Sequence, residues 1–415
     1  MTGIVVSKNI HSGFFWLASV LAFIVPAASV NYPQAFYYAA LSLILLSLFS
    51  FIVRTDPQPL SKLEKVMICT WLLYPAIVAL DLWLRAGWIW PLFQQSSRFM
   101  LVVPIFLMVR RFGISLNALK WGFFIGAVVV GFWALYQKLI LGVYRVHGGT
   151  STLVEAFGDI SLLLGVISVA LFQPNWSKDW RWGFVALVSL SLGVFASLAS
   201  GTKGGWISVP ILCWVMVSLV RHPSYTKRFI VLSGMLTSAV LIWYFSPFIQ
   251  ARVGNIPLAI ASYFETGEVA AGSAGIRLAL WHAGTLIFID NPLLGVGTGN
   301  FHTAKLPYVE AGLLSPGILH LAVHSQFFNA LVELGIVGPI LVFSIYGVFI
   351  MHCRTYMLEN KSLATAGVLL VVAFMDFGLV EVIWGINNTG VFFTVLMALI
   401  AGQLSYEGHS RPTAN

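Results

Sequence analysis

The run LKWGFFIGAVVVGFWALYQKLIL, residues 119–141, decides the fold class of this chain. A membrane-spanning helix needs about 20 predominantly apolar residues, and the only charged residues of this run, Lys120 and Lys138, lie near its two ends. Comparable runs recur along the 415 residues, near 14–30, 35–53, 65–84, 97–110, 157–173, 182–199, 205–220, 229–247, 325–352, 364–384 and 389–405. The sequence therefore predicts an all-α, polytopic membrane protein with about twelve transmembrane helices.

The composition excludes a soluble globular protein. Hydrophobic residues make up 59% of the chain and charged residues only 9%, whereas soluble domains carry about 25% charged residues. The cysteines Cys69, Cys213 and Cys353 lie in or beside predicted spans, so no disulfide framework is indicated. Residues 8–31 could be a signal peptide instead of a first span, because Lys8 precedes an apolar run that ends in PAAS.

The distribution of lysine and arginine predicts the orientation. With the N-terminus in the cytoplasm, most basic residues lie on the cytoplasmic side, which favours cytoplasmic termini and an even number of spans. The net charge of +8 then mainly reflects the basic residues of the cytoplasmic loops, and it does not indicate binding of nucleic acid. The basic residues left in the outer half are Arg85, Arg98, Lys138, Arg145, Lys203, Arg252, Arg277 and Lys305. Arg85, Arg252 and Lys305 could simply snorkel to the headgroups, but Lys203, Arg145 and Arg277 adjoin glycines or a patterned loop and are favoured as functional.

One long connection divides the chain into three parts. We predict nine transmembrane helices in residues 1–247, a periplasmic loop in residues 248–323, and helices ten to twelve with a short cytoplasmic tail in residues 324–415. Within the loop, residues 249–264 and 275–290 have helical spacing but are too short or too interrupted to span, which suits helices that lie on the outer leaflet. Long structured loops are usually functional.

After these two helices the loop contains the glycine run GVGTG, residues 295–299. No Lys-Ser/Thr pair follows it and no strand–turn–helix unit surrounds it, so a nucleotide-binding loop is disfavoured. Tight turns near a helix end are the favoured interpretation, although such turns can also present backbone amides to an anion. The chain has no Cys/His spacing typical of zinc and no outer Asp-x-Asp pair. Lysine and arginine would have to neutralise a phosphate-bearing substrate, and we predict a site without metal or cofactor.

HSQFFNALVELG, residues 324–335, follows the loop and places a histidine at the start of a predicted membrane helix. The positive end of the helix dipole favours a neutral imidazole there, and a neutral imidazole can accept a proton. Glu333 is nine residues further on and about 13 Å away along the helix, too far to orient the ring. An interfacial histidine bound to loop backbone is the structural alternative, and Glu333 is expected to support helix packing.

Three motifs occur in order on the predicted outer side: R-x-x-x-W-x-A (Arg277, Trp281, Ala283), N-P-L-x-G-x-G-x-G-N-F (residues 291–301) and H-S-x-x-x-x-x-x-x-E-x-G (His324, Ser325, Glu333, Gly335). Together they resemble the O-antigen ligase and O-antigen polymerase superfamily of polytopic bacterial glycosyltransferases. S-G-T-K-G-G, residues 200–205, is similar to the Ser-Arg-Gly motif of that superfamily, with Lys203 where arginine is commoner. Tyr144-Arg145 to Gly158-Asp159 is weakly similar to an earlier outer loop.

The resemblance implies a GT-C-like architecture in the inner membrane of a Gram-negative bacterium, with a periplasmic active site. It implies transfer of a polysaccharide from undecaprenyl pyrophosphate to lipid A-core, with His324 and Arg277 as catalytic residues and with Lys203, Arg145 and Trp281 binding substrate. Donor, acceptor and membrane lipids are the expected partners, and nucleic acid is not. An O-antigen polymerase or a protein O-oligosaccharyltransferase is the alternative within the superfamily. A lipid-oligosaccharide flippase or transporter, for which Asp376 in a predicted span is the main feature, is the alternative outside it.

Overall fold

The computed structural model describes residues 8–53, 58–149, 152–173, 179–206, 243–266 and 273–410, with isolated residues between 207 and 242. Within these ranges the regular elements are helices, and no strand occurs. Ten of the described helices are long and apolar enough to cross a membrane. They are α1 (Lys8–Ala28), α2 (Pro33–Ser50), α3 (Lys62–Asp81), α4 (Trp90–Phe112), α5 (Leu116–Leu139), α6 (Val154–Phe172), α7 (Trp180–Ser200), α15 (Val337–Thr355), α16 (Lys361–Val380) and α17 (Asn387–Ser410). The all-α, polytopic prediction is confirmed.

The count of about twelve spans stays a prediction. Each of the ten spanning helices overlaps one of the predicted apolar runs. The remaining two runs, 205–220 and 229–247, both contain residues outside the described ranges, so neither is described as a continuous helix.

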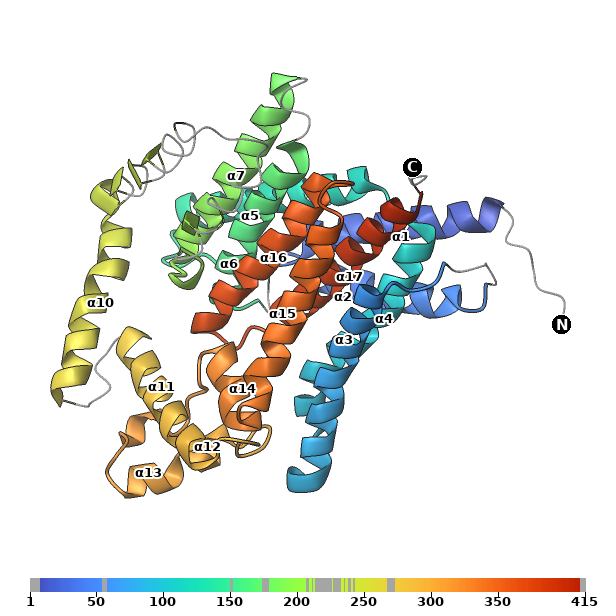
Figure 1. Cartoon of the computed structure of the whole chain (residues 1–415). Coiled ribbons are helices and arrows are strands. Elements are labelled where there is room, and N and C mark those ends of the chain that lie inside the picture. Colours follow the sequence, from blue (N-terminus) through green and yellow to red (C-terminus); the bar gives the residue numbers. More distant parts are fainter. Residues whose placement is uncertain are drawn as a thin grey trace.

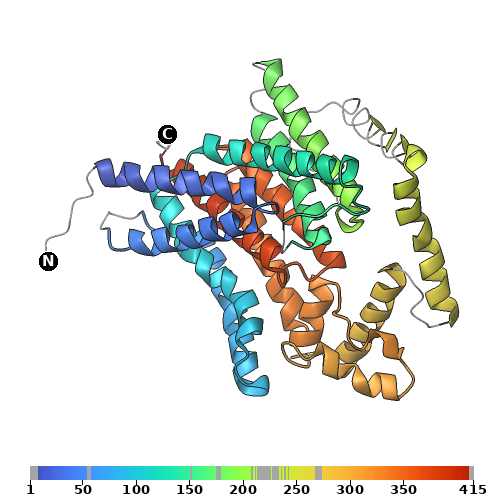
Figure 2. The ribbon, with the colours of Figure 1, turned by 180° about the vertical axis from the view of Figure 1, so that it is seen from behind.

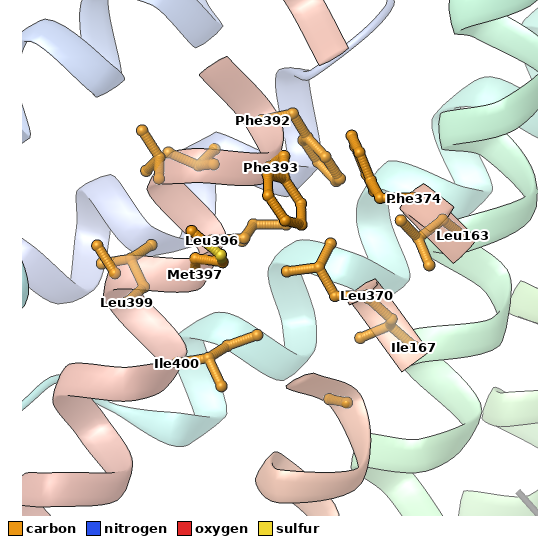
Figure 3. Close-up of a cluster of buried hydrophobic side chains, with 14 of the residues drawn as sticks. Leu163, Ile167, Leu370, Phe374, Phe392, Phe393, Leu396, Met397, Leu399 and Ile400 are labelled. Atoms are coloured by element: carbon orange, nitrogen blue, oxygen red, sulfur yellow. The ribbon is translucent and has the colours of Figure 1, made fainter. Parts of the chain in front are cut away.

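The centre of the bundle is formed by α6, α16 and α17. In α6 and α17, 89% of the most apolar window is buried inside the protein, against 33% in α1. α6 packs against α7 and α16, and α17 packs against α4 and α16. Figure 3 shows Leu163 of α6, Phe374 of α16 and Phe393 of α17 converging in this core. Because these apolar faces are buried, the ends of α6 and α16 have fixed positions, and the polar residues of the candidate site lie at these ends.

The segment 247–334, between α7 and α15, lies outside the bundle of the ten spanning helices (Figure 1). It contains α10 (Pro247–Thr266), α11 (Ser273–Asp290), the single turns α12 (Phe301–Ala304) and α13 (Leu306–Glu310), the 3₁₀ turn η3 (Pro316–Ile318), and α14 (Gln326–Leu334). α10 packs against α11, and α11 against α14. In Figures 1 and 2, α11 to α14 gather beyond the ends of α15 and α16, and α10 stands to one side. Both helices predicted in the long loop are therefore present, and their place on the outer leaflet stays a prediction.

The predicted run 325–352 is not one helix. It breaks at Gly335, whose φ of 60° lies in the left-handed region, into the nine-residue α14 and the spanning α15. The chain before it supplies substitutes for the missing helical hydrogen bonds. The amides of Val296 and Gly297 donate to the carbonyls of Val332 and Glu333, each at 2.9 Å, and the Ile336 amide donates to the Pro292 carbonyl at 2.9 Å. The backbone groups at the break thus remain paired.

The π-helical turn η1 (Leu82–Ala86) extends α3 toward the same end of the protein. Arg85 in this turn pairs with Asp81 at 3.3 Å and donates to the Gly295 carbonyl at 2.7 Å. The proposed snorkelling of Arg85 is therefore replaced by a contact within the protein. Lys305 is fully buried, and its ammonium donates to the carbonyls of Ile318 and Leu321 at 2.6 and 2.7 Å.

Candidate active site

The three outer cations favoured as functional line one cavity. Its volume is about 160 Å³, and it lies where the ends of α6, α7 and α16 meet α11. Its lining consists of Arg145, Glu155, Asp159, Thr202, Lys203, Gly204, Arg277, Val380 and Glu381. Arg145, Lys203 and Arg277 are separated widely in sequence, so their common cavity is a result of the tertiary structure.

Lys203 is placed by a tight turn at the end of α7. The helix stops at Gly201, which has a φ of 66°, and the Thr202 hydroxyl donates to the Val154 carbonyl of α6 at 3.2 Å. The turn packs so closely on Gly158 of α6 that a Cβ atom there would lie 2.3 Å from the Ser200 hydroxyl. The segment 200–205 and Gly158, which belong to two separate motif similarities, are therefore in direct contact.

Both arginines of the cavity are anchored through their Nε atoms. Arg145 Nε donates to the Ser200 carbonyl at 2.8 Å, and its Nη2 atom pairs with Glu155 at 3.1 Å. Arg277, on α11, donates from Nε to the Val380 carbonyl at the end of α16 at 3.1 Å. Burial lowers the pKa of Arg277, and the neighbouring carboxylates, Glu381 first, oppose that shift. A guanidinium presents a planar fork of donors to carboxylate or phosphate oxygens.

His324 borders this cavity through Glu381. Its Nδ1 atom lies 2.9 Å from Glu381 Oε2, and 34% of the histidine side chain is exposed. The residue precedes α14, whose N-cap is Ser325, so it does not stand on a spanning helix as predicted. The histidine is therefore bound to a carboxylate rather than to loop backbone, which was the structural alternative.

Glu381 is the residue of this site that sequence reasoning missed. Burial alone raises the pKa of its carboxyl group, but the His324 hydrogen bond, the Val382 amide and Arg277 bring that pKa below the ordinary value. The sequence interpretation counted Glu381 within the apolar run 364–384, although α16 ends one residue earlier, at Val380. An ionisable residue in an apolar run is a functional candidate by default, and that signal could have identified it.

The segment around His324 is bound to the linker between α16 and α17. Ser325 Oγ donates to the Gly378 carbonyl at 3.2 Å, the Gln326 amide donates to the Glu381 carbonyl at 3.1 Å, and the Trp384 amide donates to Gln326 Oε1 at 3.0 Å. The linker is held in turn by Arg98 of α4, which donates to the Trp384 carbonyl at 2.8 Å. Arg98 therefore has a structural role, and the distance between His324 and Glu381 is enforced from both sides.

Trp281 does not line the charged cavity. Its ring stacks on Phe328 of α14, with centroids 5.6 Å apart and planes inclined by 9°. It lines a second, larger cavity of about 530 Å³ with Tyr263 and His282, whose side chains are 3.0 Å apart. The structure thus assigns Trp281 a packing contact, and its binding of substrate stays a prediction.

The glycine run belongs to the architecture around the site. Gly295, Gly297 and Gly299 all have positive φ angles. The Gly299 amide donates to Glu333 Oε1 at 2.9 Å, and the Thr298 amide donates to Asp81 at 2.6 Å. The anions that these amides face are the protein's own carboxylates, so the turn interpretation is confirmed. Among the described residues, no group of three or more His, Cys, Asp or Glu side chains is placed to hold a metal ion.

Comparison with known proteins supports the family resemblance that these motifs indicated. Residues 186–343 match the model of the family described as O-antigen ligase. This segment is therefore similar to the O-antigen ligase family. The matched segment runs from α7 into α15 and contains Lys203, Arg277 and His324, whereas Arg145 and Glu381 lie outside it. The resemblance to the O-antigen ligase and polymerase superfamily is thereby confirmed, and with it a glycosyltransferase-type role in general.

A relative from Haemophilus influenzae aligns over most of this chain. It is 24% identical over 372 residues, which cover 87% of this chain and 92% of the relative, and it is named an uncharacterized protein. The similarity therefore extends well beyond the matched domain on both sides. Together with the ten apolar helices, the family supports a multi-pass membrane protein.

Proposed function

We propose that this protein is an O-antigen ligase, which transfers O-antigen polysaccharide from undecaprenyl pyrophosphate to lipid A-core on the periplasmic side of the inner membrane. The observation that carries the proposal is the single cavity bordered by Arg145, Lys203 and Arg277, next to a histidine held by Glu381. Cations that converge on one cavity suit a pyrophosphate, and a neighbouring imidazole suits the proton transfer that an acceptor hydroxyl requires.

In the proposed reaction His324 accepts the proton of the acceptor hydroxyl through Nε2. The hydroxyl oxygen forms a bond to the anomeric carbon of the donor sugar, and the bond from that carbon to the pyrophosphate oxygen breaks with its electron pair. Undecaprenyl pyrophosphate leaves, and direct attack inverts the anomeric carbon. Arg277, Lys203 and Arg145 stabilise the charge that grows on the leaving group, a preorganised electrostatic role.

The Glu155 carboxylate fits this role because it holds Arg145 before the donor arrives. Glu155 pairs with Arg145, and both side chains are partly exposed, at 36% and 27%. An exposed ion pair is weak, so a pyrophosphate can replace Glu155 as the partner of Arg145. Donor binding would then exchange one anionic partner for another and leave no arginine unpaired.

The purified full-length protein in phospholipid can test this function directly. It is incubated with lipid-linked O-antigen and with either lipid A-core or no acceptor, in the presence of excess chelator. Transfer only to lipid A-core is expected. Lengthening of the donor chain would instead indicate a polymerase, transfer to protein would indicate a protein-directed transferase, and movement of donor across vesicles without transfer would indicate a flippase. Loss of transfer in chelator that a divalent ion restores would contradict the metal-free site.

Two substitutions separate the roles of base and anion binding. His324→Ala is expected to lose about 10²- to 10⁴-fold in transfer rate, the range that a positioned base contributes, while donor binding is retained. Arg277→Ala is expected to weaken donor binding as well as rate, with partial recovery in Arg277→Lys because lysine lacks the planar fork. Full transfer by His324→Ala, or unchanged donor affinity in both Arg277 variants, would overturn the corresponding role.

A further inference from the structure

We propose that Glu381 is a positioning residue for the transfer reaction: it fixes which nitrogen of His324 carries the proton and directs the other nitrogen toward the acceptor hydroxyl. This inference rests on the proposed function, because it requires His324 to act as the base. Glu381 lies outside the residues that match the O-antigen ligase family, and no motif in the sequence contains it.

The hydrogen bonds of the Glu381 carboxylate determine the tautomer of His324. Oε2 lies 2.9 Å from His324 Nδ1, and Oε1 accepts the Val382 amide at 3.0 Å. An ionised carboxylate can only accept hydrogen bonds, so in the neutral ring the proton resides on Nδ1. Nε2 then carries the lone pair that can take a proton from a hydroxyl group.

The backbone at His324 is held in an uncommon conformation that keeps the ring near Glu381. Its φ is 47°, and it is the only non-glycine residue with positive φ in the described part of the chain. Such a conformation is strained and persists only where surrounding contacts enforce it. Here the contacts of Ser325 with Gly378 and of Gln326 with Glu381 enforce it from the next two residues.

The charges around Glu381 keep its carboxylate ionised. His324 faces it from the segment before α14, and Arg277 faces it from α11. Lys203 and Arg145 share its cavity, as do the carboxylates Glu155 and Asp159 of α6. The His324 hydrogen bond and the Arg277 charge outweigh burial, so the pKa of Glu381 lies below its ordinary value. The carboxylate is thus available as an acceptor throughout the neutral pH range.

The experiment compares Glu381→Gln and Glu381→Asp with Glu310→Gln, which removes an exposed carboxylate of α13. Transfer rate, donor affinity and thermal stability are measured in the full-length protein between pH 5 and pH 9. We expect Glu381→Gln to lose about tenfold or more in rate, but no more than the roughly 10²- to 10⁴-fold that the positioned base itself supplies, with donor affinity unchanged. A neutral partner stabilises the imidazolium less than a carboxylate does, so the acid limb of the pH–rate profile should move to lower pH. Glu381→Asp should restore part of the rate and the position of that limb, and Glu310→Gln should match the wild type.

A double variant excludes a merely structural role. Because a positioning residue acts through the histidine, Glu381→Gln should cause no further loss of rate in a His324→Ala background, as expected for residues that act as a unit. An additional loss there, or lost donor affinity in both Glu381 variants, would overturn the inference. Wild-type rate and pH profile in Glu381→Gln would do the same. If Glu381→Gln does not fold, Glu381→Asp decides: a wild-type rate contradicts the inference, and a reduced rate with an unmoved acid limb supports it. Absence of any transfer by the wild type would instead refute the proposed function.

Discussion

A carboxylate lies near each end of α14, Glu381 near the first residue and Glu333 near the last, and the two have different surroundings. At the N-terminal end, Glu381 binds a partly exposed His324, and its pKa is lowered by that contact and by Arg277. At the C-terminal end, Glu333 accepts the amide of Gly299 and the side chain of Asn329, each at 2.9 Å. Burial raises the pKa of Glu333 to about 7 despite these hydrogen bonds.

This difference indicates a role at the proposed active site for Glu381 and a role in stabilising the fold for Glu333. The Glu381 carboxylate is surrounded by cations beside a cavity, so it can act on a group that meets substrate. The Glu333 carboxylate accepts the Gly299 amide of the glycine run and the Asn329 side chain of its own helix, so these contacts stabilise the break in the chain at Gly335. Glu333 and Glu381 are both acidic residues in predicted apolar runs, so the sequence does not distinguish them. The groups that each carboxylate contacts in the structure do distinguish them.

The largest expected effect comes from a substitution at Gly295, which packs against the C-terminal end of α14. A Cβ atom there would lie 2.4 Å from the Val332 carbonyl, and φ is 63°. Gly295→Ala therefore combines a backbone clash with roughly 1–2 kcal/mol of left-handed strain, and we expect a large loss of folded protein. Gly312→Ala is the matched control, because Gly312 has a φ of 72° with nothing within 4 Å of its Cβ position. Melting temperatures and purification yields measure the difference, and equal values for the two variants would contradict the close packing.

The second prediction concerns the pH dependence of stability, which the raised pKa of Glu333 should affect. The folded protein holds the proton up to about pH 7, whereas an unfolded chain releases it near pH 4.3. Unfolding between these values releases a proton, so stability falls as pH rises through this window. Each pKa unit corresponds to roughly 1.4 kcal/mol, which amounts to at most a few kcal/mol in total. Glu333→Gln should flatten the dependence of melting temperature on pH between about 4.5 and 7, and parallel curves for the two proteins would rule this out.

The smallest expected effect is at the N-cap of α14. Ser325 accepts the Phe328 amide at 3.4 Å, and loss of such a cap costs about 1 kcal/mol. Ser325→Ala should lower the melting temperature slightly and reduce transfer, because His324 directly precedes the cap. Ser325→Asn keeps a good N-cap residue and should stay close to the wild type. The idea fails if the two variants have the same stability.

Much of the site was predictable because motifs and orientation identified its cations. Lys203, Arg145 and Arg277 were favoured as functional residues, and the structure brings all three to one cavity. Trp281, on the same helix as Arg277, instead lines a second cavity. Spacing along a helix shows which residues share it, but not which neighbouring element each residue meets.

The sequence by itself determined the all-α, polytopic architecture, because an apolar run of about 20 residues forms a spanning helix whatever its neighbours are. It also carried the resemblance to the O-antigen ligase and polymerase superfamily, because the order of the motifs is a property of the chain. The tertiary structure alone decided where α14 ends and what His324 binds. Both depend on contacts between distant segments: the glycine run takes the place of helical hydrogen bonds at Gly335, and Glu381 reaches His324 across 57 residues. No local periodicity encodes such a partner.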